Sequence, residues 1–223
     1  MRYFVTGTDT GVGKTRVTAA LAATMRARAA VTIVKLVQTG VDATEPGDAE
    51  FAGALAGVPS RELHRFRLAA DPWNAAIAEG RTPLAAAALA NELDAIAGDL
   101  VLEGAGGIAV PLSATESLAD VALRADATAI VVVGLRLGCI NHALLTLEHL
   151  ARRTVPVTCV VLTEPWEPVA PGYRFQVERT LTAKGATDAR ARIVHLPFDS
   201  DARRSVATAV DAASFAIEAS SRP

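Results

Sequence analysis

A glycine-rich stretch near the start of the chain, TGTDTGVGKT from Thr6 to Thr15, combines residue types that bind phosphate. When such a loop leads from a strand into a helix, its N–H groups converge on phosphate oxygens and the helix dipole adds to the attraction. Lys14 would then reach the β- and γ-phosphates, and the Thr15 hydroxyl would ligate Mg²⁺. The spacing differs by one residue from G-x-x-x-x-G-K-[ST], because the upstream glycine is Gly7. The alternative is a capped strand-to-helix turn that binds nothing.

Lysine is scarce in this chain, since only Lys14, Lys35 and Lys184 are lysines among 22 basic residues. A lysine kept against that bias indicates a site that needs a compact ammonium rather than a planar guanidinium. Lys35 comes where a strand is expected to end, so we expect it to point into the same crevice as Lys14. The alternative for Lys35 is a strand-end lysine whose stem packs on apolar surface. Lys184 lies in a polar stretch and is interpreted as a surface residue.

Two carboxylates follow predicted strands. Glu103 ends an aliphatic run and precedes several glycines, the place where P-loop proteins hold Mg²⁺ or its water shell. A strand-terminating turn is the alternative for Glu103. Asp48 opens a helical stretch, and the sequence leaves open whether it acts near a metal or only as a helix N-cap.

Three further loops follow predicted strands. Gly138 precedes an expected helix start near Cys139–Asn141, whose free N–H groups would suit a carboxylate. The segments 163–166 and 197–199 lie where a nucleotide base could be clamped. These are the least specific of the site predictions.

The residues above must be positioned by strands and helices, and the sequence alternates between short apolar runs and helical stretches. This alternation predicts a three-layer α/β domain in which helices flank a mainly parallel sheet. The connections between its strands are expected to be right-handed crossovers. Strands are expected at Tyr3–Thr6, Val31–Val37, Leu100–Leu102, Thr128–Gly134, Val157–Leu162 and Ile193–Leu196. Helices are expected at Lys14–Ala29, Asp48–Ala56, Pro83–Ala97, Asn141–Arg153, Gln176–Lys184 and Arg203–Ala219. Ligands of such sheets bind beyond the carboxyl ends of the strands.

The segment Leu63–Thr82 is the least regular, and its Asp71-Pro72 turn indicates an excursion at the sheet edge. No linker interrupts the chain, so residues 1–223 are expected to form one P-loop domain.

Composition excludes several classes of protein. The net charge is −2, which gives no basic field for nucleic acid, and the apolar runs are too short to span a membrane. The strand-like run Tyr3–Val5 begins at once, so no signal peptide is expected. Cys139 and Cys159 form no metal or redox pattern. We therefore expect a cytoplasmic protein.

Four motifs in order resemble those of the ATP-dependent dethiobiotin synthetases, which belong to the P-loop NTPases. Gly7–Thr15 match the family's lengthened loop, and residues 35–40, KLVQTG, match its second motif except at the proline. Glu103–Gly107 are the family's EGAGG, and Gly138–Thr146 match its G-x-I-N-H-x-L-L-T. Each motif alone is weak, but four in this order are specific.

The resemblance implies a homodimeric enzyme that joins the two amines of 7,8-diaminopelargonate with CO₂ into a cyclic urea. It implies a carbamate, which ATP or another nucleoside triphosphate phosphorylates to a mixed anhydride before the second amine closes the ring. The catalytic groups would be Lys35, Lys14 and Thr10, and Mg²⁺ would be held by Thr15, Asp48 and Glu103. The substrate would meet Thr39 and the N–H groups of Gly138, Cys139, Ile140 and Asn141, the last four across the dimer interface. The nucleotide would be bound by Gly11, Val12, Gly13, Lys14, Thr15, Arg16, Asp48, Glu103, Gly104, Ala105, Gly106, Thr163 and Pro197.

The chain departs from the family pattern at four places. Leu36 replaces a proline, which is expected to loosen a turn, and Gly11 stands where many relatives carry Glu. Trp73-Asn74 replaces a frequent Pro-His pair, so recognition of the amines can differ. Thr163 replaces an Asn that often meets the base, and Thr cannot offer an amide's paired donor and acceptor. A relaxed preference for adenine is therefore our hypothesis.

Three other functions remain as alternatives. Partition- or septum-site-type ATPases carry a signature lysine five residues before the P-loop lysine, where this chain has Asp9. The synthetase-like domain of cobyrinic-acid amidotransferases comes with a glutaminase domain that does not fit in 223 residues. A catalytically silent nucleotide-binding module would not need Lys35, Asp48 and Glu103 together.

Overall fold

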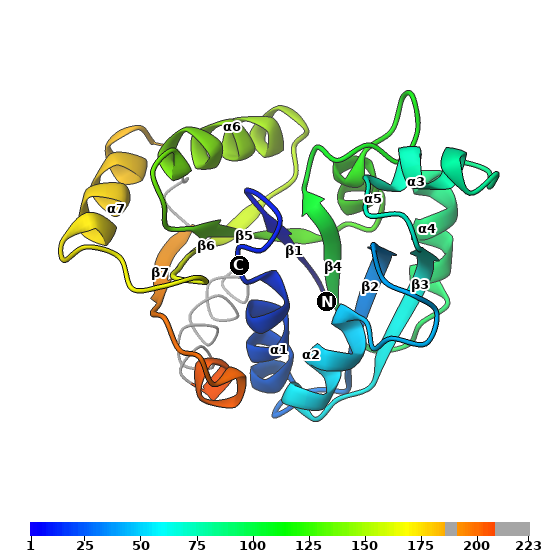
Figure 1. Ribbon diagram of the computed structural model, residues 1–223, viewed down its shortest axis with the longest axis horizontal. Helices are drawn as coiled ribbons and strands as arrows, with labels where there is room; N and C mark the ends of the chain where they lie inside the picture. Colours follow the sequence, from blue (N-terminus) through cyan, green and yellow to red (C-terminus); the bar gives the residue numbers. More distant parts are fainter. Residues whose placement is uncertain (186–190, 208–223) are drawn as a thin grey trace.

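The computed structural model describes residues 1–185 and 191–207, and within them one parallel sheet forms the centre of the molecule (Figure 1). The strand order is β3-β2-β4-β1-β5-β6-β7, and every neighbouring pair is parallel. The strands are β1 (Arg2–Gly7), β2 (Val31–Thr39), β3 (Ser60–Phe66), β4 (Asp99–Gly107), β5 (Thr128–Gly134), β6 (Val157–Thr163) and β7 (Arg192–Leu196). The predicted α/β fold with a parallel sheet is confirmed.

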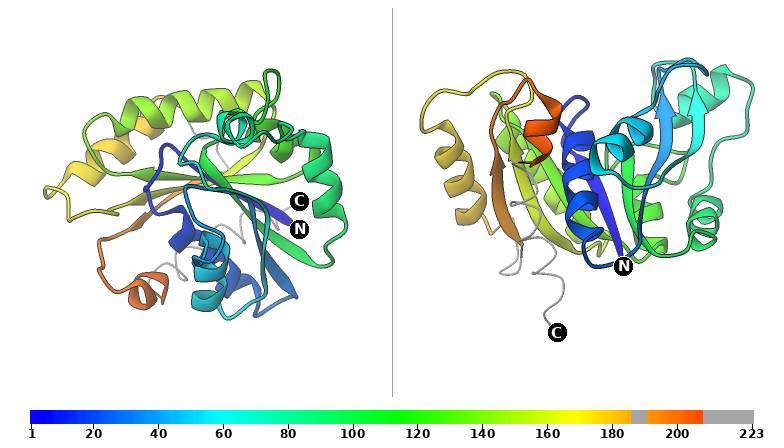
Figure 2. Two further views of the ribbon diagram at one scale, coloured as in Figure 1. Left: turned by 45° about the vertical axis from the view of Figure 1, so that its right-hand side comes forward. Right: turned by 90° about the horizontal axis from the view of Figure 1, so that it is seen from below.

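Helices cover both faces of the sheet, as Figures 1 and 2 show. They are α1 (Lys14–Met25), α2 (Asp48–Ala56), α3 (Pro72–Ala78), α4 (Ala86–Asp94), α5 (Leu118–Arg124), α6 (Cys139–Arg152) and α7 (Tyr173–Ala183). One core cluster joins α1 and α2 to one face, and a larger cluster joins α3 to α7 to the other. The result is the expected three-layer arrangement.

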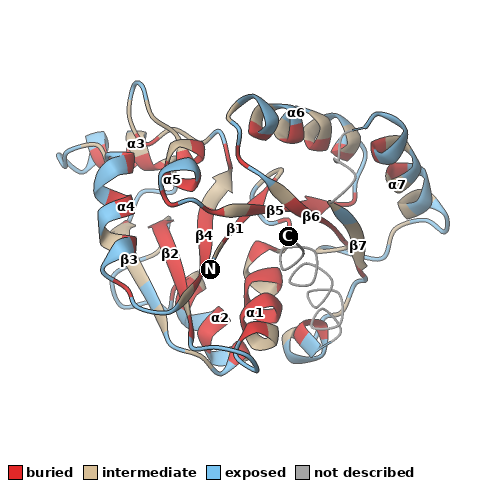
Figure 3. Ribbon diagram, turned by 180° about the vertical axis from the view of Figure 1, so that it is seen from behind, coloured by how far each residue is buried: buried red, intermediate tan, exposed pale blue. Residues whose placement is uncertain are grey.

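Alternation along β1 explains why Tyr3, Phe4 and Val5 in its middle are all apolar. Tyr3 and Val5 point into the core beneath α1 and α2, whereas Phe4 points into the core beneath the other helices. All three are fully buried, and Figure 3 shows the central strands as buried over most of their length. A strand covered on both faces has no polar side, as expected for a parallel sheet.

The sheet edge beside β2 differs from the sequence prediction. Within the segment expected to be irregular, residues 63–66 belong to β3, which pairs with β2 along its length, and Pro72–Ala78 form helix α3. The predicted Asp71-Pro72 turn is wrong, because Asp71 is the N-cap of α3 and accepts the N–H of Asn74 at 3.0 Å. The prediction that this segment lies at the edge of the sheet is confirmed, because β3 is the first strand in the order.

Two strands extend further than predicted. β4 continues through the glycines to Gly107, and β2 continues to Thr39, so Lys35 and Glu103 lie within strands rather than at their ends. Leu36 is fully buried inside β2, so the expectation that it loosens a turn is wrong.

Other helix boundaries differ from the prediction by a few residues, and α5 was not predicted. Of the helix expected over 203–219, residues 203–207 are helical and the remainder lies outside the described residues. Over 1–185 and 191–207, every helix is too short or too polar to cross a bilayer.

Candidate active site

The loop between β1 and α1 closes around the ammonium of Lys14, which donates a hydrogen bond to the Asp9 carbonyl at 2.9 Å. Glycine is needed at Gly7, because a Cβ there would lie 2.7 Å from that carbonyl oxygen and 3.0 Å from the Lys14 Nζ. Gly13 precedes the helix with φ of 92°, a conformation that costs other residues about 1–2 kcal/mol. The loop is a glycine cradle with a lysine inside it, which fits nucleotide phosphates.

Burial, followed by the charge of Lys35, lowers the pKa of Lys14 to about 8. An anion placed against the ammonium would raise this pKa again, because it favours the charged form. The cradle therefore holds a lysine whose charged form would be stabilised by a bound phosphate.

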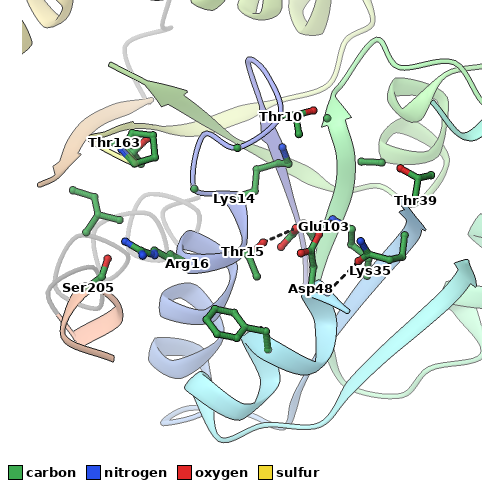
Figure 4. A pocket seen from close by; sticks show the side chains of 18 of the residues that line it. Thr10, Lys14, Thr15, Arg16, Lys35, Thr39, Asp48, Glu103, Thr163 and Ser205 are labelled. Carbon is green, nitrogen blue, oxygen red and sulfur yellow. Dashed lines mark hydrogen bonds and ion pairs between the residues drawn. The ribbon is translucent and has the colours of Figure 1, made fainter. Parts of the chain in front are cut away.

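Lys35 lies opposite Glu103 in the register of β2 and β4, so the two side chains leave neighbouring strands side by side. The Lys35 Nζ is 2.8 Å from Glu103 Oε1, 2.5 Å from Asp48 Oδ2 and 3.3 Å from the Gly104 carbonyl oxygen (Figure 4). Lys35 is 3% exposed and Glu103 is 1% exposed. Burial alone lowers the pKa of Lys35, but Glu103 and Asp48 outweigh it and raise the pKa above its usual value. Lys35 is therefore a charged ammonium held between two carboxylates.

Oxygen donors for a metal ion gather at this place. The Thr15 hydroxyl donates to Glu103 Oε1 at 3.1 Å, and Figure 4 shows Asp48 facing the same space. Among the described residues no group of three or more His, Cys, Asp or Glu is arranged to hold a metal. Mg²⁺ usually binds proteins through one or two carboxylates and takes its other ligands from water and phosphate. The hydroxyl and two carboxylates fit that ion.

Asp48 is oriented by its neighbours. Its N–H donates to the side-chain oxygen of Gln38 at 3.0 Å, which ties the start of α2 to β2. The N-cap position of α2 is Gly47, so the interpretation of Asp48 as an N-cap is wrong. Its carboxylate faces Lys35 instead.

These groups line one cavity of about 560 Å³ beyond the carboxyl ends of the central strands. The predicted site residues that line it are Thr10, Gly11, Gly13, Lys14, Thr15, Arg16, Lys35, Thr39, Asp48, Glu103, Ala105, Gly106, Thr163 and Pro197. Val12 and Gly104 lie behind the lining, Val12 with a buried side chain and Gly104 with its carbonyl towards Lys35.

Thr163, the last residue of β6, contacts the backbone of the phosphate loop. Its hydroxyl lies 2.7 Å from the Val12 carbonyl oxygen and 3.2 Å from the Val133 carbonyl oxygen, and the residue is 2% exposed. The hydroxyl is thus directed to the backbone of the loop and of β5. Thr163 lines the cavity, but its polar atom is already engaged.

The start of α6 lies apart from this cavity, since none of Gly138, Cys139, Ile140 and Asn141 lines it. Gly138 is the N-cap and α6 begins at Cys139, so the predicted helix start after Gly138 is confirmed. The expectation of a free N–H at Cys139 is wrong, because that group donates to the Arg136 carbonyl at 3.0 Å. The N–H groups of Ile140 and Asn141 lie in the first turn, where a helix provides no acceptor of its own.

Several lining residues were not predicted. Gln38 and Ser205 are buried polar residues of the cavity, and Phe51 also lines it. Glu164 and Pro165, from the segment expected near the base, line the cavity as well. Gln38 could have been found as a polar residue inside an apolar run, whereas no sequence pattern marks Ser205. The Ser205 hydroxyl is buried and has no hydrogen-bond partner among the residues that the structure describes.

The comparisons with known proteins place this chain in a family. The model of the AAA domain matches residues 1–204. A protein of Anaeromyxobacter dehalogenans (strain 2CP-C) named ATP-dependent dethiobiotin synthetase BioD is 43% identical over 71% of this chain and 74% of its own length. A protein of Anaeromyxobacter sp. (strain Fw109-5) with the same name is 36% identical over 86% of this chain and 89% of its own length. The chain belongs to the ATP-dependent dethiobiotin synthetase family.

Solved structures similar to this dethiobiotin synthetase family member share its fold. The septum site-determining protein MinD of Pyrococcus horikoshii OT3, complexed with Mg-ADP, matches with a TM-score of 0.56 and 16% identity, over 100% of this chain and 97% of its own. A ParA family ATPase of Chlorobium tepidum TLS matches with a TM-score of 0.51 and 13% identity, over 93% and 89% of the two chains. At such low identity the likeness shows the fold alone.

Proposed function

We propose that this protein is an ATP-dependent dethiobiotin synthetase, which joins 7,8-diaminopelargonate and CO₂ into the cyclic urea of dethiobiotin with formation of ADP and phosphate. The observation that carries the proposal is the meeting of Lys14, Lys35 and Glu103 in one cavity of a chain of this family. Each of these residues is used by the chemistry of the reaction.

The reaction needs positioning and charge neutralisation more than covalent help from the protein. A carbamate forms when one amine attacks CO₂ and loses a proton. The carbamate oxygen then attacks the γ-phosphorus and ADP leaves. The second amine attacks the resulting anhydride at carbon, expels phosphate, loses a proton to water or to the departing phosphate, and closes the ring. Lys14 neutralises charge on the phosphates, and Lys35 holds the carbamate.

Mg²⁺ would be held by Thr15, Asp48 and Glu103, and it would neutralise charge on the phosphate oxygens. The support is the oxygen-donor set around Glu103, in which the Thr15 hydroxyl already contacts the carboxylate. The nucleotide base would lie towards Ser205, which Figure 4 shows at the end of the cavity away from Lys35, and Pro197, which lines the same cavity, would contact it.

The substrate carboxylate is assigned to the first turn of α6 in a second copy of the chain, since this turn does not line the cavity of its own chain. The N–H groups of Ile140 and Asn141 would be its donors. Thr39, at the end of β2, would hydrogen-bond the substrate near Lys35. The protein would accordingly act as a homodimer.

A nucleotide-switched ATPase of the MinD or ParA type is the alternative suggested by the fold. Asp9 opposes it, because those proteins carry a lysine at this position of the loop. A silent nucleotide-binding module is opposed by the charged cluster of Lys35, Asp48 and Glu103, which phosphate binding alone does not need.

The test is incubation of purified protein with 7,8-diaminopelargonate, labelled bicarbonate, Mg²⁺ and ATP, followed by measurement of acid-stable label. Carbamate loses its label in acid, whereas the cyclic urea keeps it. We expect label well above that of Lys14→Ala, which lacks the phosphate-binding ammonium. Equal label in the two proteins with every nucleoside triphosphate would refute the function.

A second variant tests the role of Lys35. Lys35→Arg keeps the charge but puts a wide guanidinium where an ammonium contacts three oxygens, so turnover should fall strongly. Near-normal turnover would show that Lys35 is structural. Running the assay with ATP, GTP and CTP measures the base preference that Thr163 leaves open.

A further inference from the structure

The tip of the phosphate loop is held from outside the nucleotide cavity by Arg136. The Arg136 guanidinium forms an ion pair with the Asp9 carboxylate, whose other oxygen accepts the N–H of Thr10 at 2.7 Å. The Asp9 carbonyl is also the acceptor for Lys14. Asp9 therefore contacts Thr10 and Lys14 within the loop, and Arg136, from the connection between β5 and α6, is the cation that balances its charge.

Trp166 supports the same tip from the loop after β6. The Arg136 guanidinium lies over its ring at 5.5 Å from the centroid. A Cβ built on Gly134 would lie 3.0 Å from the ring, and one built on Gly11 would lie 3.8 Å from its nitrogen. The indole thus packs between β5 and the loop while remaining about half exposed.

The backbone of Arg136 is fixed as well. Its carbonyl accepts the hydroxyl of Tyr173 at 2.8 Å and the N–H of Cys139 at 3.0 Å. Arg136 is therefore anchored at the start of α6 and at the start of α7. Because its backbone is fixed in this way, Arg136 can hold the tip of the loop in one place through its guanidinium.

We propose that Arg136 is a positioning residue for the nucleotide: it neutralises Asp9 and fixes the tip of the phosphate loop. Asp9 puts a negative charge on a loop that must accept a polyphosphate anion. Without Arg136 that charge would repel the ligand and the tip would lose its anchor. The proposal rests on the nucleotide site of the proposed function.

The expected size of the effect follows from exposure. The two side chains are 46% and 43% exposed, so the surrounding water weakens the ion pair and its effect on binding. We expect Arg136→Gln to raise the Kd for ADP about five-fold at low salt, the upper end for a half-exposed pair. The difference should shrink as salt rises towards about 1 M, because the repulsion from Asp9 is then screened.

The test is calorimetric titration of the purified full chain with ADP. Arg152→Gln is the matched control, because Arg152 pairs with Glu148 on the outer surface of α6, where both side chains are exposed. This control should bind ADP as the wild type does. An Arg136→Gln protein that binds ADP as tightly as the control overturns the proposal.

Two further variants separate charge balance from general damage. Asp9→Asn keeps an acceptor for the Thr10 N–H but removes the charge, so adding it to Arg136→Gln should restore the Kd to within about two-fold of wild type. No recovery in this double variant overturns the proposal. Arg136→Lys keeps the charge without the planar stack, so it should bind ADP more tightly than Arg136→Gln.

The fluorescence of Trp166 reports on the loop tip, and its response to ADP would not change if Arg136 served only the stability of the fold. In a Trp73→Phe background the remaining indole emission should change when ADP fills the loop, and the change should be smaller with Arg136→Gln. In Arg136→Gln the KM for ATP should rise while kcat stays nearly unchanged. A fall in kcat with an unchanged KM would contradict the proposal that Arg136 positions the nucleotide. A wild type that binds ADP but forms no dethiobiotin would refute the proposed function and leave this proposal standing.

Discussion

The substitution Lys35→Met removes the ammonium that lies between Glu103 and Asp48 and leaves a side chain of similar length. Glu103 is 1% exposed and would keep the Thr15 hydroxyl as a hydrogen-bond donor after losing its cation. The change therefore leaves a buried carboxylate without a counter-ion. We expect it to destabilise the protein before any ligand is added.

The magnitude follows from the geometry. At 2.8 Å and an effective dielectric constant of about 20, the attraction between Lys35 and Glu103 is about 6 kcal/mol before the cost of removing both charges from water. Measured losses on breaking buried pairs are about 3–5 kcal/mol. For a chain of this size each kcal/mol corresponds to about 2–4 °C in Tm, so the expected fall is about 6–20 °C.

The assay is thermal and urea unfolding of the nucleotide-free protein, with Lys184→Met as the control. Lys184 is exposed, so its loss should change stability by less than about 0.5 kcal/mol. Adding Glu103→Gln to Lys35→Met should recover part of the stability, because the uncompensated charge is then gone. A Lys35→Met protein as stable as the control, or a double variant that is less stable than Lys35→Met, would refute the reasoning.

Three other predictions concern the phosphate loop. Since the pKa of Lys14 is about 8 and a bound phosphate would raise it, ADP binding at pH 8 should take up about half a proton and should weaken as the pH rises further. The buffer supplies that proton, so the observed heats in Tris and in HEPES should differ in proportion to the ionisation enthalpies of the two buffers. Equal uncorrected heats in the two buffers would contradict the prediction. Thr163→Val leaves the Val12 carbonyl without its hydroxyl donor, so the free energy of unfolding should fall by about 1–2 kcal/mol and ADP should bind more weakly; unchanged urea midpoint and affinity would show that the hydroxyl does not hold the loop. Gly13→Ala places a side chain at φ of 92° and should cost about 1–2 kcal/mol of stability, which an unchanged Tm would contradict.

The sheet was largely predictable because its inner strands are buried on both faces. In a chain that alternates strands with helices, a short continuous apolar run such as that of β5 is typical of an inner parallel strand. β3 was missed because it is an edge strand: of its residues Ser60–Phe66, Phe66 alone is fully buried. Its polar side chains carry no apolar pattern, and pairing with β2 alone makes it a strand.

The candidate site was predictable where residues are close in sequence or carry rare side chains. Lys14 and Thr15 belong to one short motif, and the scarcity of lysine marked Lys35. Arg136 could not be found in this way, because its partner Asp9 is 127 residues away and arginine is common in the chain. Such pairs depend on how the loops after β1 and β5 meet, which no local pattern records.

Because of where it lies, Lys35 is a built-in counter-ion for the carboxylates of Asp48 and Glu103. Two carboxylates this close together would repel one another, yet here the ammonium of Lys35 lies between them at 2.5 and 2.8 Å. A free metal ion must compete with this ammonium, whereas an ion that arrives with a polyphosphate brings anions that the ammonium can bind instead. If the cavity binds Mg²⁺ and nucleotide as proposed, we expect it to bind the two together more readily than either of them alone.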